Sequence, residues 1–455
     1  MSMDIARIKQ DNAKYFWHPM AHPKALLTQP PDIIARGEGS WIWDIDGHKM
    51  IDGMAGLWSC NLGHSNQRVI DAMVAQLREL PYYNAFRGTT HPKAIELSSR
   101  LVQVMAPEKV AAVVFSNGGS DAAEGALKLA RQYWKLKGAP ERTKFIGMKQ
   151  GYHGVHFGGV SVGSIPQNRR AYEPLLPGCF HIDSPWPYRN PWTQDPEELG
   201  RIVAGQLERE IQFQGPDTVA AFIAEPVQGA GGVIVPPKNF WSLVREVCDR
   251  HGVLLIADEV ITGFGRTGHL FGTRMWGVNA DIWCLAKGIS SGYIPLGATA
   301  IGQKVADAFL NDESGQGVVG HGFTYSGHPV ACAAGLASLD EIEQRDIPGN
   351  AASVGAHLQA RLASFVERFS FVGNARGVGL MACLEMVTDK AKKTTIPKGN
   401  DLLHRLQRAA YRHGAMVRVS GPNMILSPPL TMTIAEADHL VDVLDTAFAE
   451  VEAAK

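Results

Sequence analysis

Two short apolar runs, each ending in ionisable residues, constrain the fold of this 455-residue chain more than any other feature. Residues 253–257 are followed by Asp258 and Glu259, and residues 282–286 are followed by Lys287. Apolar runs of this length, bounded by glycine and polar residues, are typical of buried strands in a parallel sheet. Open α/β sheets bind ligands at the carboxyl ends of their strands. The pattern therefore predicts that Asp258 and Lys287 lie in one ligand site.

The rest of the chain up to about residue 330 alternates between strand-like and helix-like patterns, which favours βαβ units and an α/β fold with a mainly parallel sheet. Residues 41–48 indicate a strand and a tight turn, and residues 166–196, with seven prolines, indicate an ordered surface loop. The other predicted elements of this part are strands at 111–115, 144–148 and 218–224, and helices at 67–80, 92–105, 121–137, 197–211 and 240–250.

The regular alternation of strands and helices ends at about residue 330, where we place a domain boundary. More than one domain is expected because 455 residues exceed the usual size of a single hydrophobic core. Helices are predicted at 331–343 and 351–369, and strands at 380–387 and 424–426. The last helix is predicted to begin at Thr433, with Glu436 completing a capping box.

Composition excludes several classes of partner. The formal net charge is -1, which implies neither a nucleic acid nor an anionic membrane as partner, and no apolar run reaches the length of a membrane span. The first residues lack the apolar core of a signal peptide. The six cysteines are scattered without metal-ligand spacing, which favours free thiols in a reducing compartment. We therefore expect a cytoplasmic protein without a metal site.

Lys287 and Asp258 each have an ordinary alternative. A lone lysine is more often a solvent-exposed residue, but a partly buried one has a lowered pKa and can form a Schiff base. Asp258 could cap a helix or bind a ribose, since residues 263–268 match the pattern GxGxxG of dinucleotide sites. In that pattern the acid follows the glycines by about 20 residues, whereas here it precedes them, so dinucleotide binding is disfavoured.

Residues 288–292 match the pattern GxSxG, with Ser290 as the candidate nucleophile of a serine hydrolase. That motif requires a helix after the serine, but residues 293–301 favour another strand. A hydrolase stays open only as a remote alternative.

Residues 116–120, Ser-Asn-Gly-Gly-Ser, join a predicted strand to a predicted helix. Such a turn can bind an anion through its backbone N–H groups, or it can be a plain turn capped by Ser120 or Asp121. An anion cradle, a lysine and a carboxylate are together the protein partners that pyridoxal phosphate requires.

These motifs carry a family resemblance. Residues 258–268 and 281–288, with 116–120, 151–154, 225–229 and 321–329, resemble the signature of class III pyridoxal-phosphate aminotransferases, most closely the ω-amino acid/amine:pyruvate branch. The resemblance implies fold type I. It implies a large domain at 61–329 with a mainly parallel sheet flanked by helices, and a smaller α+β domain from residues 1–60 and 330–455. It also implies a homodimer with its sites at the interface, with a tetramer left open.

By the same resemblance, Lys287 would hold pyridoxal phosphate as the internal aldimine, and Asp258 would keep the ring nitrogen protonated. The other implied cofactor contacts are Tyr152 and Val260 on the ring faces, Gly119 and Ser120 at the phosphate, Thr324 from the second subunit, and Glu225 at the polar edge.

The implied activity is transfer of an amino group from an amine or ω-amino acid to a keto acid, expected to be pyruvate, in two ping-pong half-reactions. Arg418 would bind the carboxylate of the acceptor, and Leu57, Trp58 and Phe86 would form apolar walls for the donor. A pyridoxal-phosphate decarboxylase or aminomutase is the nearest alternative. Monoamines, diamines, β-alanine and amino alcohols all stay open as donors.

Overall fold

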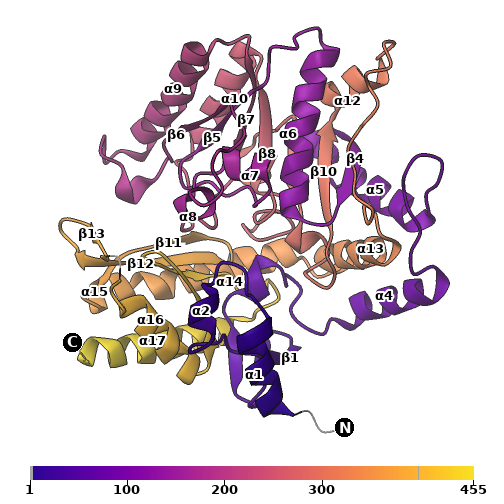
Figure 1. Cartoon of the computed structure of the whole chain (residues 1–455). Helices are drawn as coiled ribbons and strands as arrows, with labels where there is room; N and C mark the ends of the chain where they lie inside the picture. Colours follow the sequence, from indigo (N-terminus) through magenta and orange to yellow (C-terminus); the bar gives the residue numbers. More distant parts are fainter. Residues whose placement is uncertain (1–3, 398, 455) are drawn as a thin grey trace.

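A seven-stranded sheet lies at the centre of the computed structural model, which describes residues 4–397 and 399–454 (Figure 1). Strands β5 to β9 run parallel to one another, and only β10 is antiparallel to its two neighbours. In spatial order the strands are β4 (Val110–Ser116), β10 (Gly297–Gly302), β9 (Ile282–Leu285), β8 (Leu254–Asp258), β7 (Val219–Ala224), β5 (Lys144–Met148) and β6 (Cys179–Ile182).

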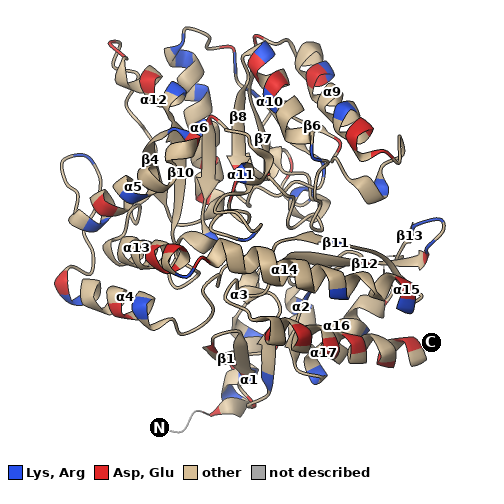
Figure 2. Ribbon diagram, turned by 180° about the vertical axis from the view of Figure 1, so that it is seen from behind, with Lys and Arg blue, Asp and Glu red and all other residues tan. Residues whose placement is uncertain are grey.

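Helices cover both faces of this sheet because successive residues of each buried strand point to opposite sides. On one face, Ile223 and Ile256 pack in an apolar cluster with α6 (Gly119–Leu136). Their neighbours Phe222 and Leu255 lie in a second cluster with α9 (Pro196–Gln214) and α10 (Phe240–His251). Charged residues lie along the outer faces of helices such as α9 and α10, whereas the central strands are mostly uncharged (Figure 2).

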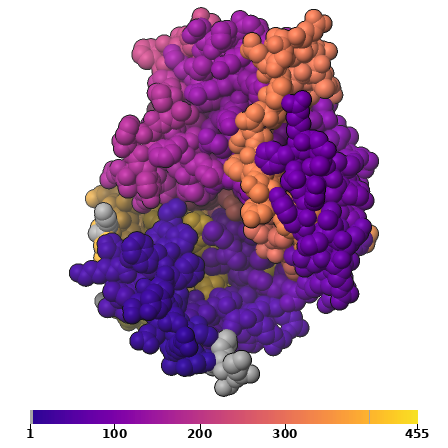
Figure 3. All heavy atoms as spheres, turned by 45° about the vertical axis from the view of Figure 1, so that its right-hand side comes forward, coloured from indigo at the N-terminus to yellow at the C-terminus, as the bar shows by residue number. Residues whose placement is uncertain are grey.

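Two smaller sheets lie outside the central one, and the first of them joins the two ends of the chain. One contains β1 (Ile34–Glu38), β2 (Trp41–Asp44), β3 (Lys49–Asp52) and β14 (Ala415–Met416). In it the C-terminal β14 pairs in parallel with the N-terminal β3. The other contains β11 (Val372–Val378), β12 (Met381–Asp389), β16 (Asn423–Leu426) and β15 (Arg418–Ser420), with β13 (Thr394–Thr395) beside β12. N-terminal and C-terminal residues therefore lie together below the large sheet (Figures 1 and 3).

The remaining long helices enclose these sheets. Helices α4 (Gln67–Glu79) and α5 (Pro92–Val104) pack on α13 (Pro329–Gln344), while α14 (Ile347–Ala363), α16 (Leu402–Arg412) and α17 (Ile434–Ala453) belong to the C-terminal part. None of the helices within residues 4–397 and 399–454 combines the length and the apolar character needed to span a bilayer. The division of the chain at residues 60 and 329 stays a prediction.

Most predicted elements are confirmed within a few residues, and β5 has the predicted bounds. Two predictions were wrong. The segment 166–196 is not a simple loop, because its residues Cys179–Ile182 form β6 at the edge of the sheet, paired in parallel with β5. The helix predicted at 351–369 begins earlier and divides into α14 and the short α15 (Phe365–Arg368).

The predicted capping box at the start of α17 is confirmed. The Thr433 hydroxyl accepts the Glu436 N–H at 3.2 Å, and the Glu436 carboxylate accepts the Thr433 N–H at 2.8 Å. We expect Thr433→Ala to lower the free energy of unfolding by about 1 kcal/mol, measured by urea denaturation. Thr446→Ala in the same helix is the matched control, because its exposed hydroxyl donates only to the Asp442 carbonyl at 2.9 Å. Equal losses for the two variants would contradict a capping role.

Candidate active site

The two apolar runs form neighbouring parallel strands, β8 and β9, and bring their ionisable residues to one edge of the sheet. Asp258 is the last residue of β8 and lies opposite Cys284 of β9. Lys287 follows β9 by two residues and opens a short 3-10 turn (Lys287–Ile289). Both side chains line a cleft of about 1440 Å³. Lys287 and Asp258 therefore line one cleft at the carboxyl ends of neighbouring strands, as the sequence pattern predicts.

A histidine that the sequence reasoning did not single out holds Asp258. The Asp258 Oδ2 atom accepts a hydrogen bond from His153 Nδ1 at 2.8 Å, and its Oδ1 atom accepts the Val260 N–H at 3.0 Å. Both side chains of the pair are buried. Burial by itself lowers the pKa of His153, but the hydrogen bond and charge of Asp258, with the charge of Glu225, outweigh it and raise this pKa. The raised pKa of His153 thus follows from its buried contact with Asp258.

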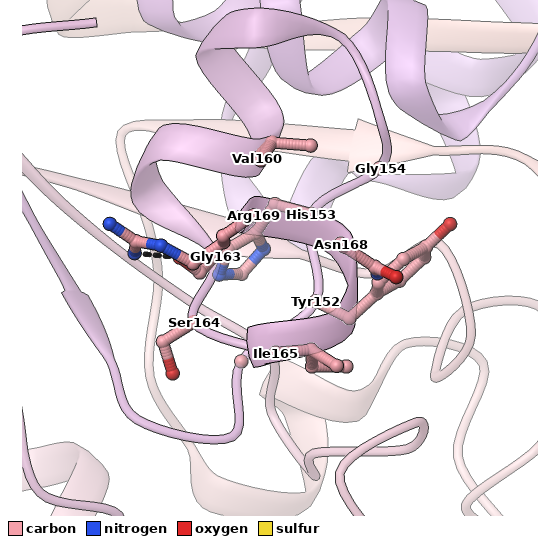
Figure 4. Close-up of a pocket in the computed structure, with 10 residues that line it drawn as sticks. Tyr152, His153, Gly154, Val160, Gly163, Ser164, Ile165, Asn168 and Arg169 are labelled. Carbon is pink, nitrogen blue, oxygen red and sulfur yellow. Dashed lines mark hydrogen bonds between the residues drawn. The ribbon is translucent and has the colours of Figure 1, made fainter. Parts of the chain in front are cut away.

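Figure 4 shows the far side of His153, beside a cavity of about 10 Å³, roughly the size of one water molecule. Within the described residues, His153 Nε2 and the Ser164 hydroxyl are buried without a hydrogen-bond partner, and both residues line this cavity. Arg169 closes it on another side and donates to the Gly163 carbonyl at 2.7 Å. The only signal for His153 in the sequence is its place beside Tyr152 in the Gly-Tyr-His-Gly motif.

A second buried carboxylate, Glu225, lies in the same cleft at the end of β7. Its Oε1 atom accepts the Tyr152 N–H at 3.0 Å, and its Oε2 atom accepts the Gly229 N–H at 2.9 Å. Burial raises the pKa of Glu225 to about 7, with a further contribution from the charge of Asp258, although His153 and the two N–H donors oppose the rise. The Glu225 carboxyl therefore titrates near neutral pH.

Lys287 is half-buried, and its environment favours the neutral amine. Burial is the main cause that lowers the pKa of Lys287 to about 8, and the charges of Arg418 and Arg266 add to it. Asp258 and Glu225 oppose this shift without cancelling it. A lysine with such a pKa has a reactive neutral fraction at neutral pH, as Schiff-base chemistry requires.

The turn between β4 and α6 fits a phosphate group. The first N–H groups of a helix have no partner within it, and the helix dipole favours an anion there. A Cβ atom at Gly118 would meet nothing within 4 Å, so the backbone is open toward the cleft. A Cβ atom at Gly119 would lie 2.7 Å from a methyl of Val260, so a side chain there would collide with that wall of the cleft. Ser120 also lines the cleft, and its hydroxyl accepts the Val155 N–H at 3.2 Å.

The chain brings some predicted substrate residues into the cleft and not others. Leu57, Trp58 and Arg418 line it, together with Tyr152 and Val260. Phe86 and Thr324 are not among its lining residues in this single chain, and both are exposed. They lie on two exposed segments that contact each other. Tyr82 donates to the Thr324 carbonyl at 2.7 Å, and the Phe86 ring lies close to Gly322.

The two competing motifs have structural explanations. The Ser290 hydroxyl donates to the Ile294 carbonyl at 2.7 Å, and the next element is β10 rather than the helix that a nucleophile elbow requires. The glycines of residues 263–268 lie in a loop that packs on the C-terminal part, with Gly268 close to Ala352 and Gly265 close to Leu430. Neither motif has the geometry of the hydrolase or dinucleotide site that it resembles.

Comparison with known proteins supports one assignment throughout. The family model described as "Aminotransferase class-III" matches residues 26–448. The chain is 40% identical over 425 residues to the putrescine–pyruvate aminotransferase of Pseudomonas aeruginosa. The match covers 93% of this chain and 91% of that protein.

Solved structures agree with this match. An amine transaminase from an uncultivated Pseudomonas species, in its pyridoxal-phosphate-bound form, is 52% identical with a TM-score of 0.95, over 96% of this chain and 99% of that one. An (S)-enantioselective ω-transaminase from Thermomicrobium roseum is 39% identical with a TM-score of 0.96, over 99% of this chain and 100% of that one. These findings confirm the predicted fold type I and the predicted cofactor, pyridoxal phosphate.

The lowered pKa of Lys287 is open to direct measurement. After removal of the cofactor, we expect reductive methylation of Lys287 by formaldehyde and cyanoborohydride to rise with pH through a midpoint of about 8. Ordinary lysines titrate near 10.4, so a short lysine peptide in the same reaction provides the reference. Peptide mass spectrometry measures both reactions. Coincident pH profiles for Lys287 and the peptide would contradict the shift.

Proposed function

Since this chain belongs to the class III aminotransferases, we propose that it transfers the amino group of a primary amine or ω-amino acid to pyruvate. The chain is a pyridoxal-phosphate-dependent aminotransferase that acts on an amine and a keto acid. The residues that carry each step, and pyruvate as the preferred acceptor, are our proposal. The observation that carries it is the half-buried Lys287, with a pKa of about 8, in one cleft with Asp258 and Arg418.

Bound pyridoxal phosphate supplies an aldehyde that takes up the amine and a ring that withdraws electrons from it. Lys287 Nζ would hold the cofactor at its aldehyde group. Once free, it would move a proton at the substrate carbon, a task that suits a base with a pKa near neutrality. Asp258 would hold the ring nitrogen, and His153 holds Asp258.

The remaining cofactor contacts follow from the cleft walls. The N-terminus of α6 at Gly119 and Ser120 would bind the phosphate, because the first N–H groups of a helix and its dipole favour an anion. Tyr152 and Val260 contact the ring, and Glu225, which already receives the Tyr152 N–H, orients the polar edge. Thr324 belongs to the phosphate site of a second copy, which agrees with its exposed place outside the cleft of its own chain.

A homodimer, with a tetramer as the larger option, completes the site in this proposal. Several large apolar side chains are exposed on the segments around Phe86 and Thr324, and exposed apolar patches often mark interfaces. They are Tyr82, Tyr83, Phe86, Val318, Val319 and Tyr325. A cytoplasmic location agrees with the six free cysteines.

The donor meets Leu57 and Trp58, with Phe86 from the second copy, whereas the keto acid meets Arg418. A guanidinium binds a carboxylate through two parallel N–H donors. The hydrogen bonds and ion pairs found among residues 4–397 and 399–454 include none from the Arg418 side chain, which leaves its donors free for a substrate. The comparisons do not favour the decarboxylase or aminomutase alternative, since the relatives reported above are aminotransferases.

Replacing Lys287 separates this function from the hydrolase alternative. We expect Lys287→Ala to abolish alanine formation from pyruvate and an amine, together with the visible absorption of the bound cofactor, because no other group in the cleft supplies the amine. Ser290→Ala is the control, and we expect it to keep most of the activity, since the Ser290 hydroxyl only donates to the Ile294 carbonyl. Loss of ester hydrolysis in Ser290→Ala with intact hydrolysis in Lys287→Ala would overturn the proposal.

Arg418 should act on the acceptor more than on the donor. We expect Arg418→Met to raise the KM for pyruvate at least about tenfold, because charge-assisted hydrogen bonds contribute roughly 1.5–3 kcal/mol. The KM for a neutral donor such as butylamine should change much less. Arg209→Met on the exposed side of α9 removes the same charge far from the cleft and should change neither constant. Equal rises in both KM values for Arg418→Met would contradict carboxylate binding.

A further inference from the structure

We propose that Ser164 and one water molecule form a hydrogen-bonded bridge to the outer nitrogen of His153, and that Ser164 is therefore a positioning residue for the His153–Asp258 pair. The bridge would occupy the cavity of about 10 Å³ that lies beside His153. The water site follows from the geometry of this chain alone, whereas its effect on the reaction rests on the proposed function.

The two ring nitrogens of His153 have unequal surroundings. The Asp258 carboxylate can only accept a hydrogen bond, so the proton in their 2.8 Å contact is on Nδ1. The Nε2 atom is buried, and within residues 4–397 and 399–454 it has no hydrogen-bond partner. It carries a proton in the charged ring and a lone pair in the neutral ring, and a buried polar atom without a partner is costly in both states. The ring therefore needs a partner that can donate as well as accept.

The Ser164 hydroxyl is a second buried polar group without a partner in the described part of the chain. Figure 4 shows it with His153 among the residues that line the cavity. Both groups lie beside Gly151: the Ser164 N–H donates to the Gly151 carbonyl at 3.0 Å, and a Cβ atom on Gly151 would lie 3.3 Å from His153 Nε2. Two unpaired groups of complementary chemistry thus border one small space without bonding to each other.

A single water molecule fits this space and its chemistry. A buried water needs roughly 10–15 Å³ of accessible volume and about two to four polar partners. The cavity measures about 10 Å³ and offers His153 Nε2 and the Ser164 hydroxyl, so it meets the lower bound of both requirements. Water and hydroxyl groups each donate and accept, so the bridge suits the charged and the neutral ring alike.

The ionisable groups around the ring do not replace this bridge. Asp258 on β8 and Glu225 at the end of β7 act on His153 through negative charge, which favours its protonated form. Arg169 lines the cavity, and His181 on β6 is close enough to interact with the charge of His153. Arg169 and His181 contact each other at 3.2 Å and bond to backbone carbonyls, and neither bonds to Nε2.

The bridge would hold the His153 ring at both of its nitrogens. With Nδ1 bound to Asp258 and Nε2 bound to the water, the imidazole keeps one orientation. Hydrogen bonds to a charged ring are stronger than those to a neutral ring, so the bridge also favours the protonated form. In the proposed function Asp258 holds the ring nitrogen of the cofactor, and a fixed His153 keeps that carboxylate in place. Ser164 would thus act on the reaction without contact to either substrate.

High-resolution crystallography of the cofactor-loaded enzyme tests the bridge directly. We expect one ordered water within about 3.2 Å of both His153 Nε2 and the Ser164 hydroxyl oxygen. A direct hydrogen bond between the two side chains, or density in which no water contacts both of them, would overturn the inference.

Titration of His153 in the cofactor-free protein tests what the bridge does. With ¹³C at Cε1 of the histidines, the NMR signal of His153 is the one missing from His153→Gln. We expect Ser164→Ala to lower the proton affinity of His153 at least about tenfold, because the charged ring loses more than the neutral ring when the bridge is cut. An unchanged titration in Ser164→Ala would contradict the bridge.

Ser161→Ala is the matched control for this titration. Ser161 is 1% exposed, and its hydroxyl donates to the Phe157 carbonyl at 2.5 Å and accepts the Leu176 N–H at 2.9 Å. It is as buried as Ser164 is close to it in sequence, but it does not line the cavity as the structure describes it. We expect the titration of His153 to be unchanged in Ser161→Ala. Equal shifts in both variants would indicate a general loss of packing and would overturn the inference.

Kinetics of the cofactor-loaded enzyme test the effect on the reaction. We expect Ser164→Ala to lower kcat of the amine half-reaction at least about fivefold and to change the KM for butylamine and for pyruvate less than about twofold. Ser164 is not among the described residues that line the main cleft, so it has no place in substrate binding. An unchanged kcat would overturn the positioning role. Failure of the unsubstituted enzyme to use any amine would instead overturn the proposed function, and the crystallographic and NMR results would still decide the bridge.

Discussion

The buried hydrogen bond between His153 and Asp258 is the interaction on which the rest of the site depends. A buried ion pair gains little overall, but removal of one partner leaves an uncompensated charge and costs roughly 3–5 kcal/mol. The charge of Asp258 also reaches its neighbours, since it raises the pKa of Glu225 and opposes the lowering of the pKa of Lys287. The charge of one carboxylate at the end of β8 therefore affects the pKa values of both Glu225 and Lys287. That placement depends on the parallel register of β8 and β9.

The loop after β8 gives this arrangement its second support. Arg266, within the glycine-rich residues 263–268, is fully buried and donates to Asn61 Oδ1 at 2.9 Å and to the Leu380 carbonyl at 2.8 Å. One side chain thus ties the loop after β8 to the N-terminal part of the chain and to the turn before β12. Its complete burial lowers the pKa of Arg266 to about 9. The glycines of residues 263–268 let this loop pack closely on the C-terminal part of the chain. This packing explains why the pattern GxGxxG occurs here without a dinucleotide site.

The sequence was sufficient for elements whose signal is local. Asp258 and Lys287 could be placed because continuous apolar runs predict buried parallel strands, and Thr433 because a capping box is a local pattern. The edge strand β6 was missed, since only its last residue is buried and its four residues have neither a continuous apolar run nor clear alternation. His153 was missed because its role comes from a contact 105 residues away in the chain. Phe86 and Thr324 were assigned from the family resemblance alone, and in the single chain both are exposed and lie outside the lining of the cleft.

Both turns that carry the proposed donor wall and the lysine contain strained backbone. Ala55, Trp58 and Lys287 have φ values of 45°, 64° and 49°, a left-handed region that side chains with a Cβ rarely adopt, at a cost of roughly 1–3 kcal/mol each. The surroundings hold them there: the Asp52 carboxylate accepts the N–H groups of Met54 and Gly56 at 3.0 and 2.9 Å, and Trp58 is buried. These contacts fix the backbone beside Leu57 and Trp58, so the fold itself sets the position of the cleft wall relative to Lys287.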